Sequence, residues 1–405
     1  MAKKSVEKVK KIVYNSKERI EVYAMPNSLS DSGRKFSCSI KFDVNPGNTH
    51  VSQIVAGYKM LEKQGILKIE SAQPCRTFRS SGNYEHNSIV EVEIGGKVIA
   101  YDMADGYQSI HRFDVLDKEL ERLDFYFKRS CDSKRHVGMK NADKIKPLGL
   151  NYLCSCKGNP YDDFIVDGHS LGELKRYLVY LKTKKNNIYD YSIFESNGRH
   201  YDDYRLLFLT RLWDSSGISA QNIKRTYPYF TDAQAAEEAD KWKASLDKAT
   251  KDRIEFVKTL REVYADRVIA GVSADSFSQK LCPELIVDGS FTERHRYLDE
   301  IKKNYICITS EGLHQSIGWK FAEFIAAGRA IITEPLAYET VGGIEETRNY
   351  LSYNDTETLL TACDRLMNDT DAVHAMERQN EEYYKNHLRP DKVVLDSLNT
   401  VFDVF

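Results

Sequence analysis

The sequence predicts an α/β protein with two lobes, each built around a sheet with helices between its strands. Short apolar segments of strand-like composition alternate with amphipathic helical segments along most of the chain. The alternation pauses in a polar stretch at residues 182–187 and starts again with the apolar run at 206–209. A chain of 405 residues is also long enough for two or three domains of about 150 residues each. We therefore expect two lobes that divide near residue 200.

The first half begins with a strand, a loop and a helix. The expected strands lie at 37–44, 66–69, 89–94, 98–102 and 123–127, and the two strands flanking Gly95-Gly96 form a hairpin. Thr49 is the expected cap of the first helix, and further helices are expected at 114–122 and 171–181. Since strands alternate with helices, we expect parallel pairing in both lobes.

The second half repeats this alternation. The expected strands lie at 206–209, 267–271, 305–309 and 330–333, and the expected helices lie at 232–246, 252–264 and 317–327. Ser290 with Glu293, and Asn354 with Glu357, have the spacing of helix-capping pairs. Ligands of open α/β sheets bind at the carboxyl ends of the strands, so we expect a site in a cleft between the lobes.

Composition excludes several classes of protein. The net charge of −2 and the pI near 6.6 lack the basic excess of a dedicated nucleic-acid binder. No apolar stretch approaches the roughly 20 residues that span a bilayer, and no apolar run follows the basic start as in a secretory signal. The eight cysteines are scattered without zinc-ligand spacing. We expect a cytosolic protein with reduced thiols and no metal, and weak peripheral contact of the basic N-terminus with a membrane stays open.

The segment at 305–333, YICITSEGLHQSIGWKFAEFIAAGRAIIT, carries the most chemistry. It predicts a strand, a polar glycine-containing loop, an amphipathic helix and a second strand. The backbone N–H groups and dipole at the start of such a helix suit an anion such as a diphosphate. Glu323, on the same helix, could accept hydrogen bonds from a ribose diol. The alternative is a surface helix on which Lys320 and Glu323 form an exposed pair.

This segment resembles the donor domain of GT-B glycosyltransferases of the "glycosyl transferases group 1" type. The run Glu323-Phe-Ile-Ala-Ala-Gly328 matches the second half of the family's motif, whereas Gln315 stands where the family has its first glutamate. The pair Glu311-Gly312 resembles the family's loop, although four residues too early. The resemblance implies that Glu323 binds the ribose, and it leaves open whether Glu311, His314 or Gln315 meets the sugar.

Two further stretches are similar to the same family. The run from Asn380 to Pro390 resembles the final helix and crossover of bacterial polysaccharide glycosyltransferases. The strand ending at Arg211 is similar to the one that opens the donor domain, and the family's arginine there contacts the diphosphate. From residues alone, a surface Arg211 bridging to Asp214 is an equal alternative.

The resemblance implies the GT-B fold, with two Rossmann-like domains facing each other across a cleft. Residues 1–200 would form the acceptor-side domain, with 388–405 crossing back to it, and residues 201–387 would form the donor domain. The donor-binding residues expected on this basis are Arg211, Thr309, Glu311, Gly312, His314, Gln315, Ser316, Lys320 and Glu323.

Catalytic candidates in the first lobe rest on their positions. His50 lies at a predicted helix start, where the helix dipole favours the neutral, basic imidazole. Asp102 and Asp105 follow a predicted strand and could act as the base or bind acceptor hydroxyls, and His111 is a further possibility. The alternatives are a structural histidine and an Asp-Gly turn at Asp105.

The expected function is transfer of a sugar from a nucleotide-diphosphate sugar to a hydroxyl of a glycan or lipid-linked acceptor, without a metal. Two alternatives use the same architecture: a sugar-nucleotide 2-epimerase, and a non-catalytic glycosyltransferase-like partner subunit. Gln315 is the departure that favours the partner subunit. The sequence leaves retention or inversion and the oligomeric state open.

Overall fold

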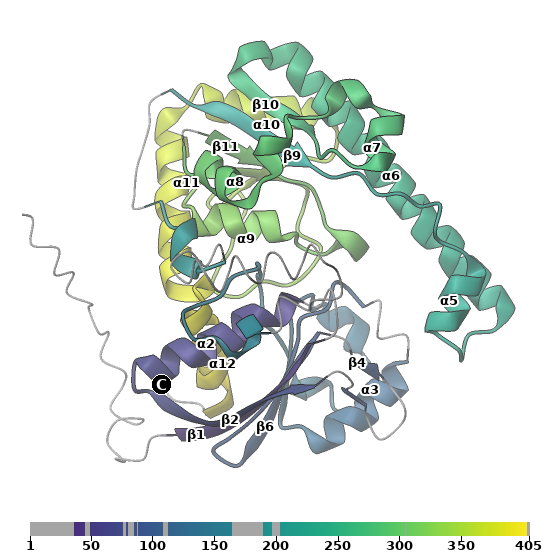
Figure 1. Ribbon diagram of the computed structural model, residues 1–405, viewed down its shortest axis with the longest axis vertical. Coiled ribbons are helices and arrows are strands. Elements are labelled where there is room, and N and C mark those ends of the chain that lie inside the picture. The colour runs from purple at the N-terminus through teal and green to yellow at the C-terminus, as the bar shows by residue number, and fades with distance from the viewer. Residues whose placement is uncertain are drawn as a thin grey trace, which may run out of the picture.

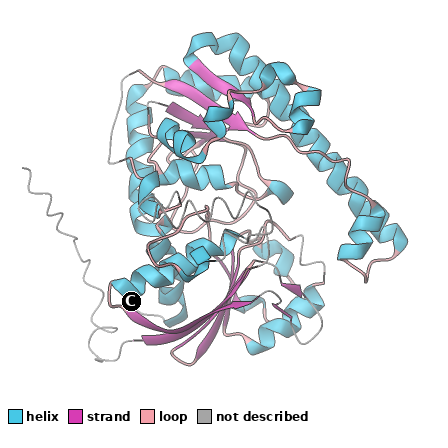
Figure 2. Ribbon diagram, in the orientation of Figure 1, coloured by secondary structure: helices cyan, strands magenta, loops and turns pink. Residues whose placement is uncertain are grey.

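The computed structural model describes residues 36–44, 49–75, 78–79, 85–86, 88–107, 112–163, 189–196, 203–303 and 305–402. They form two α/β domains, each with a central sheet covered by helices (Figures 1 and 2). The predicted strand at 37–44, the hairpin and the strand–loop–helix segment at 305–333 are all present. The predicted helix at 171–181 lies outside the described residues.

The N-terminal sheet has the strand order β2-β1-β5-β6-β7-β8. Its strands are β1 (Phe36–Asp43), β2 (Leu67–Cys75), β5 (Ile89–Ile94), β6 (Lys97–Asp102), β7 (Phe125–Lys128) and β8 (Ile145–Pro147). A separate small ribbon pairs β3 (Phe78–Arg79) with β4 (Glu85–His86). The sheet is mixed: β5 runs antiparallel to β6, as the predicted hairpin requires, and it also runs antiparallel to β1, which departs from the parallel pairing expected for the lobe. The tight turn at Gly95-Gly96, both at positive φ, requires its two strands to be antiparallel.

The described residues of this part of the chain include two α-helices, α2 (Ser52–Lys63) and α3 (Phe113–Glu119). Residues Thr49–Val51 form a 3-10 turn, so α2 starts later than predicted. The residue before α2 is Val51, which makes no side-chain cap, and the prediction of Thr49 as the cap is therefore wrong.

The C-terminal sheet is parallel throughout, with the order β10-β9-β11-β12-β13. Its strands are β9 (Arg205–Thr210), β10 (Val268–Val272), β11 (Tyr305–Ile308), β12 (Ile331–Thr333) and β13 (Leu351–Ser352). The helices around it include α7 (Ser276–Leu281), α8 (Arg294–Ile301), α9 (Trp319–Ala326), α10 (Thr356–Met367) and α11 (Thr370–Tyr383). Apart from the exposed Arg205 at the start of β9, the residues of β9, β11 and β12 are buried and mostly apolar, as expected for a parallel sheet covered on both faces.

Two predicted caps are displaced. The side chain of Asp288 caps the 3-10 turn Gly289–Thr292, and α8 begins at Arg294 without a side-chain cap. Helix α10 is capped by Asp355, which forms a reciprocal pair with Thr358 instead of the predicted pair one residue earlier. An aspartate is the cap at both positions, because its short carboxylate reaches the N–H groups of the first turn.

A long helix forms an arm on the C-terminal domain. The two helices predicted at 232–246 and 252–264 are one helix, α6 (Asp232–Tyr264), because no glycine or proline interrupts the chain between them. It has 33 residues and extends about 50 Å. Its second half packs on the sheet, whereas its first half pairs with α5 (Ala220–Thr226) and projects outward (Figure 1).

The last helix, α12 (Pro390–Phe402), lies against α2 of the N-terminal domain (Figure 1). The Tyr101 and Ser397 hydroxyls are 2.7 Å apart, and Gln53 Nε2 donates to the Leu388 carbonyl at 3.1 Å. A Cβ on Gly57 would lie 2.2 Å from the Pro390 carbonyl oxygen, so only glycine allows the helices this close. Two Rossmann-like domains with a final helix packed on the first make up the GT-B arrangement, and the predicted fold class is confirmed.

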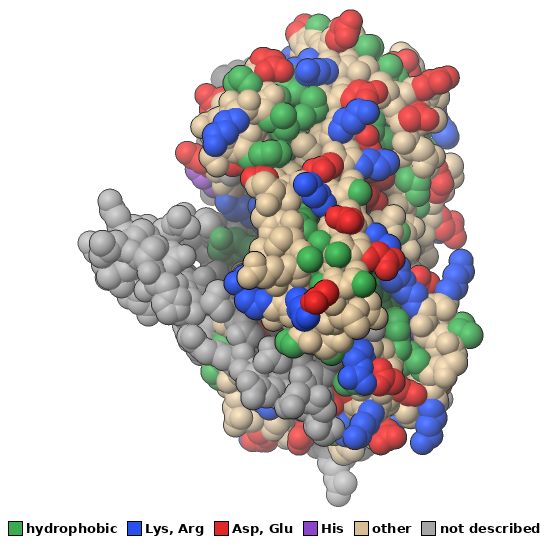
Figure 3. Space-filling model, turned by 90° about the vertical axis from the view of Figure 1, so that its right-hand side faces the viewer, with side chains coloured by type: hydrophobic (Ala, Val, Ile, Leu, Met, Phe, Trp, Pro, Cys, Tyr) green, Lys and Arg blue, Asp and Glu red, His purple; other side chains and the backbone are tan. Residues whose placement is uncertain are grey.

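The surface carries no strong single-sign field on the side drawn in Figure 3, where acidic and basic side chains are interspersed. None of the helices in the described ranges combines the length and apolar character that a bilayer span requires.

Candidate functional site

A hydrogen-bonded cluster lies at the carboxyl ends of the N-terminal strands. Arg129 follows β7 and is 3% exposed. Its Nη1 donates to Asp105 Oδ1 at 2.7 Å and to His50 Nδ1 at 2.9 Å. Asn151 lies beside them and donates through Nδ2 to the His50 carbonyl at 3.2 Å. The fold thus brings two predicted candidates, His50 and Asp105, together around one arginine.

The C-terminal domain closes directly on this cluster. Trp319 Nε1 lies 2.8 Å from Asn151 Oδ1 and 3.2 Å from His50 Nδ1, and the rings of Trp319 and His50 are 4.7 Å apart. Arg129 Nη2 donates to the Ile317 carbonyl at 2.8 Å. Because Trp319 is the first residue of α9, the start of that helix faces the cluster at the junction of the domains.

The cluster fixes the charges of its own members. Burial, followed by the charge of Arg129, lowers the pKa of His50 to about 4. Burial alone would raise the pKa of Asp105, but Arg129 and a hydrogen bond from Ser316 hold it below its ordinary value. At neutral pH His50 is therefore neutral and Asp105 is ionised.

Asp102 has a structural place instead. Its side chain is 2% exposed, and its Oδ2 accepts from Tyr126 Oη at 2.7 Å and from Lys128 Nζ at 3.0 Å. Its Oδ1 accepts from the backbone N–H of Ala104 at 2.9 Å. Both oxygens of this buried carboxylate are occupied by protein donors, and these contacts favour a structural role for Asp102 over the predicted role of a base. His111 lies outside the described residues.

The loop between β11 and α9 is strained. His314 and Gln315 have φ values of 55° and 60°, a left-handed backbone conformation that residues other than glycine rarely adopt. Tyr338 Oη donates to the His314 carbonyl at 2.8 Å, and the Trp242 ring of α6 lies 5.2 Å from the His314 ring. Gly106 of the N-terminal domain packs so closely that a Cβ there would lie 2.7 Å from His314 Cβ. Both domains and the arm meet at this loop.

Arg253 on α6 holds the base of the same loop. It is 5% exposed, and it donates to Ser310 Oγ at 3.0 Å and to the carbonyls of Arg211 and Glu311 at 2.6 and 2.7 Å. Its guanidinium stacks 3.8 Å from the centre of the Trp213 ring. Burial lowers the pKa of Arg253 to about 10, which leaves it charged at neutral pH. It positions two predicted donor-binding residues through their backbone.

Arg211 and Lys320, the two cations predicted to contact the donor diphosphate, differ in their burial. The side chain of Arg211 is exposed directly after β9. Lys320 lies in the first turn of α9, and its Nζ donates to the Leu209 carbonyl. Burial lowers the pKa of Lys320 to about 8, so it is mostly protonated at neutral pH.

Glu323 is not the exposed carboxylate of a surface helix. It is 2% exposed, its Oε1 accepts from Arg294 Nη1 at 2.7 Å, and its Oε2 accepts from Tyr297 Oη at 2.9 Å. Both partners lie on α8. The Lys320–Glu323 surface pair considered from the sequence does not form, and each Glu323 oxygen already has a protein donor.

Two glutamates, Glu311 and Glu334, lie close together beside the loop. The backbone N–H of Glu311 donates to Glu334 Oε2 at 2.7 Å, and burial together with the charge of Glu334 raises the pKa of Glu311. A carboxyl group with a raised pKa can act as an acid or bind a neutral hydroxyl. Glu334 follows β12 and had no motif to mark it.

Backbone N–H groups are open at the start of α9. The Gly312 N–H donates to the Ser316 carbonyl, the Ser316 N–H to the Leu313 carbonyl, and the Thr309 N–H to β12. By contrast, within the described chain no acceptor is recorded for the N–H groups of residues 318–320. Unpaired N–H groups at a helix start, with the helix dipole behind them, bind anions.

The space beside the loop is small in this arrangement. A cavity of about 10 Å³ lies between residues 309–318 and 333–337 and holds about one water molecule. A ligand larger than a water molecule would therefore enter only when the loop or the domains move, as in enzymes that close over their substrates. Across the ranges that the structure describes, no three His, Cys, Asp or Glu side chains converge on a metal site.

Sequence reasoning missed Arg129, Asn151, Trp319 and Arg253. Arg129 had a usable signal, because it follows a strand at the same sheet edge as Asp105. Trp319 lies within the segment already singled out, next to Lys320. Arg253 had none, since it lies in the middle of a polar helix and becomes part of the site only through tertiary packing.

The sequence matches no known protein-family model, and no curated protein matches it. Three similar solved structures are HepE of Anabaena in complex with UDP and glucose, a glycosyltransferase from Rickettsia africae, and sucrose-phosphate synthase from Thermosynechococcus elongatus. They are 9%, 11% and 14% identical, with TM-scores of 0.36, 0.34 and 0.33. The matches cover 88%, 92% and 86% of this chain and 95%, 99% and 71% of those chains. At these values the likeness concerns only the overall arrangement, and the function rests on the site itself.

Proposed function

We propose that the protein is a glycosyltransferase that moves a sugar from a nucleotide-diphosphate sugar to a hydroxyl of a glycan or lipid-linked acceptor. One observation carries the proposal. The start of α9, with its open N–H groups, faces the His50–Asp105–Arg129 cluster across the junction of the two domains. An anion-binding group and a polar cluster on opposite sides of one junction fit a donor diphosphate and an acceptor hydroxyl.

In this proposal the C-terminal domain stabilises the leaving diphosphate. The N–H groups of residues 318–320 and the protonated Lys320 act where negative charge develops, which is the most effective kind of electrostatic stabilisation. Arg211 is the exposed cation nearby and would contact the diphosphate through its fork of donors. Arg253 acts as a positioning residue, since its donors hold the backbone of the loop.

The sugar and acceptor would lie between Glu311, Gln315 and the N-terminal cluster. Asp105, held ionised, would accept a hydrogen bond from a sugar or acceptor hydroxyl. Because cations and a helix dipole neutralise the diphosphate, we propose that no metal is needed, so activity in excess EDTA should equal activity without it. A strict requirement for added Mg²⁺ or Mn²⁺ would contradict this part.

The test is calorimetric titration with UDP-, GDP-, ADP- and dTDP-sugars, followed by assays of donor hydrolysis and transfer. We expect one nucleotide class to bind and its sugar to be hydrolysed slowly without an acceptor. Failure of all four classes to bind would overturn the proposal. Binding without turnover would indicate the partner subunit, and conversion of the free nucleotide sugar to its epimer would indicate an epimerase.

Two glycine variants test the position of the proposed binding site. In Gly312→Ala the new Cβ would lie 2.5 Å from Ser316 Oγ and 2.9 Å from the Ser316 carbonyl oxygen, so the loop must shift. Gly217→Ala is the control, because a Cβ there has no heavy atom within 4 Å. We expect the first variant alone to lose nucleotide binding, by at least about tenfold. Equal binding by both variants would remove this loop from the donor site.

A further inference from the structure

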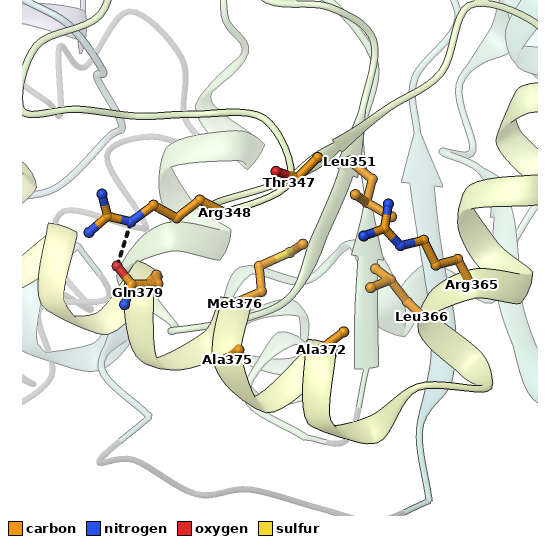
Figure 4. A pocket seen from close by; sticks show the side chains of 9 residues that line it. All are labelled: Thr347, Arg348, Leu351, Arg365, Leu366, Ala372, Ala375, Met376 and Gln379. Atoms are coloured by element: carbon orange, nitrogen blue, oxygen red, sulfur yellow. Dashed lines mark hydrogen bonds between the residues drawn. The ribbon is translucent and has the colours of Figure 1, made fainter.

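A second concavity lies on the C-terminal domain, away from the domain junction. Its volume is about 440 Å³, within the range of small-molecule sites. It is bounded by the segment before β13, by α10 and by α11 (Figure 4). The base consists of the apolar side chains of Leu351, Leu366 and Met376, and small alanines on α11 leave the space open.

Basic and neutral polar side chains form its rim, with no acidic one among the lining residues. Arg348 and Arg365 lie on opposite sides, one on the segment before β13 and the other on α10; the Arg348 guanidinium is turned toward Gln379, whereas the Arg365 guanidinium points inward (Figure 4). Arg348 Nε donates to Gln379 Oε1 at 2.7 Å, and its terminal nitrogens have no recorded acceptor in the described chain. Arg365 has no hydrogen bond or ion pair with any described residue.

We propose that this concavity binds an organic anion with an apolar body and a phosphate or carboxylate head. The apolar base and the arginine stems would contact the body, and the Arg365 guanidinium, which has no partner among the described residues, would hold the head. Such a ligand suits the site by charge, because the lining residues include two cations and no anion. The site is separate from the proposed donor site and does not depend on it.

The strained backbone at Thr347 supports a ligand site in this concavity. Thr347, at the rim beside Arg348, has φ of 67°, which is a genuine outlier for a β-branched residue. Its N–H donates to the Tyr350 carbonyl at 2.7 Å and closes the turn that presents Arg348. Strain of this kind persists where the surrounding structure holds it, and it concentrates at ligand sites.

The test is calorimetric titration with octyl phosphate below its micelle concentration, using the full chain. Octanol and inorganic phosphate each supply half of the ligand, and octylammonium reverses its charge. We expect octyl phosphate to bind at least about tenfold more tightly than any of the three, because binding needs both halves and the negative head. Equal binding of octanol or octylammonium would overturn the proposed chemistry.

Three variants locate the site. Arg365→Gln should weaken octyl phosphate binding about tenfold, the loss of one hydrogen bond to a charged group, and Ala375→Trp should abolish it by filling the space. Arg378→Gln, an exposed arginine on α11 that does not line the concavity, is the matched control. Unchanged binding in the first two variants would overturn the site. Self-association of the chain that Ala375→Trp abolishes would identify the occupant as a second copy and would also overturn it.

Discussion

The two sides of the domain junction are built on different principles. On the N-terminal side, Arg129 donates to both His50 and Asp105 and, together with burial, sets their charges. On the C-terminal side, Arg253 and Lys320 donate to backbone carbonyls. The first side therefore controls protonation, whereas the second controls the shape of the loop backbone, which in the proposed function binds the diphosphate. Substitutions on the two sides should differ in what they change.

The largest effect is expected at the anchor behind α9. Arg294→Met leaves the buried Glu323 carboxylate without its cation, which typically costs about 3–5 kcal/mol of unfolding free energy. The measurement is urea denaturation at pH 7. The double variant Arg294→Met/Glu323→Met should recover most of the loss, because it removes both charges together. A loss below about 1 kcal/mol in the single variant would show that Glu323 is free to bind a ligand instead.

Arg253 tests the shape-controlling side. Arg253→Met removes the donors that fix the carbonyls of Arg211 and Glu311, and we expect kcat/KM to fall about 100-fold as the loop moves. Arg261, two turns further along α6, is the control. Like Arg253 it makes three hydrogen bonds, here to three carbonyls that belong to β10 and the segment after α7.

Both variants should lose similar stability, because each leaves buried carbonyls without donors. Only Arg253→Met should lose activity beyond what its stability explains. If Arg261→Met lost activity equally, the loop would not be the reason, and Arg253 would be an ordinary structural arginine.

The elements around the junction could be predicted from the sequence, whereas the contacts between them could not. The strand–loop–helix segment before Gly328 could be predicted, because strands and helices leave periodic patterns and Gly328 ends the helix at φ of 60°. The positions of Glu323 and Asp102 could be predicted, but their partners could not, because Arg294 and Lys128 reach them through tertiary packing. Asp-Gly at 105–106 indicated a turn, and nothing local showed that Arg129 would make it part of a cluster.

The protonation-controlling side is tested through His50. Arginine has no acceptor, so the 2.9 Å contact requires His50 Nδ1 to accept from Arg129 and places the ring proton on Nε2. The 3.3 Å contact between Nδ1 and Asn151 Oδ1 then carries no hydrogen bond. We expect the imidazole to stay neutral from pH 5 to 8, in contrast to the base inferred from sequence, whose lone pair would have to be free.

The measurement is an NMR titration of His50 in the wild type and in Arg129→Met. In the variant the pKa should rise from about 4 toward 6.5 but stay below it, because burial persists. The unfolded histidine binds its proton at the ordinary pKa, so the wild type should lose stability as the pH falls from about 6.5 to about 4. Titration of His50 near pH 6.5 in the wild type would contradict this tautomer and would make His50 a candidate base again.

The smallest effect is expected where the two sides touch. Trp319→Phe keeps a ring against His50 but removes the N–H that Asn151 Oδ1 accepts, which should weaken domain closure by about 1 kcal/mol, or roughly fivefold. Trp242→Phe is a matched control, because the Trp242 N–H is buried without an acceptor among the described residues and its loss should cost nothing. Hydrogen exchange at the start of α9 measures the opening. Faster exchange in Trp319→Phe alone would show that closure depends on this hydrogen bond, whereas equal rates in both variants would assign closure to Arg129 and the Ile317 carbonyl.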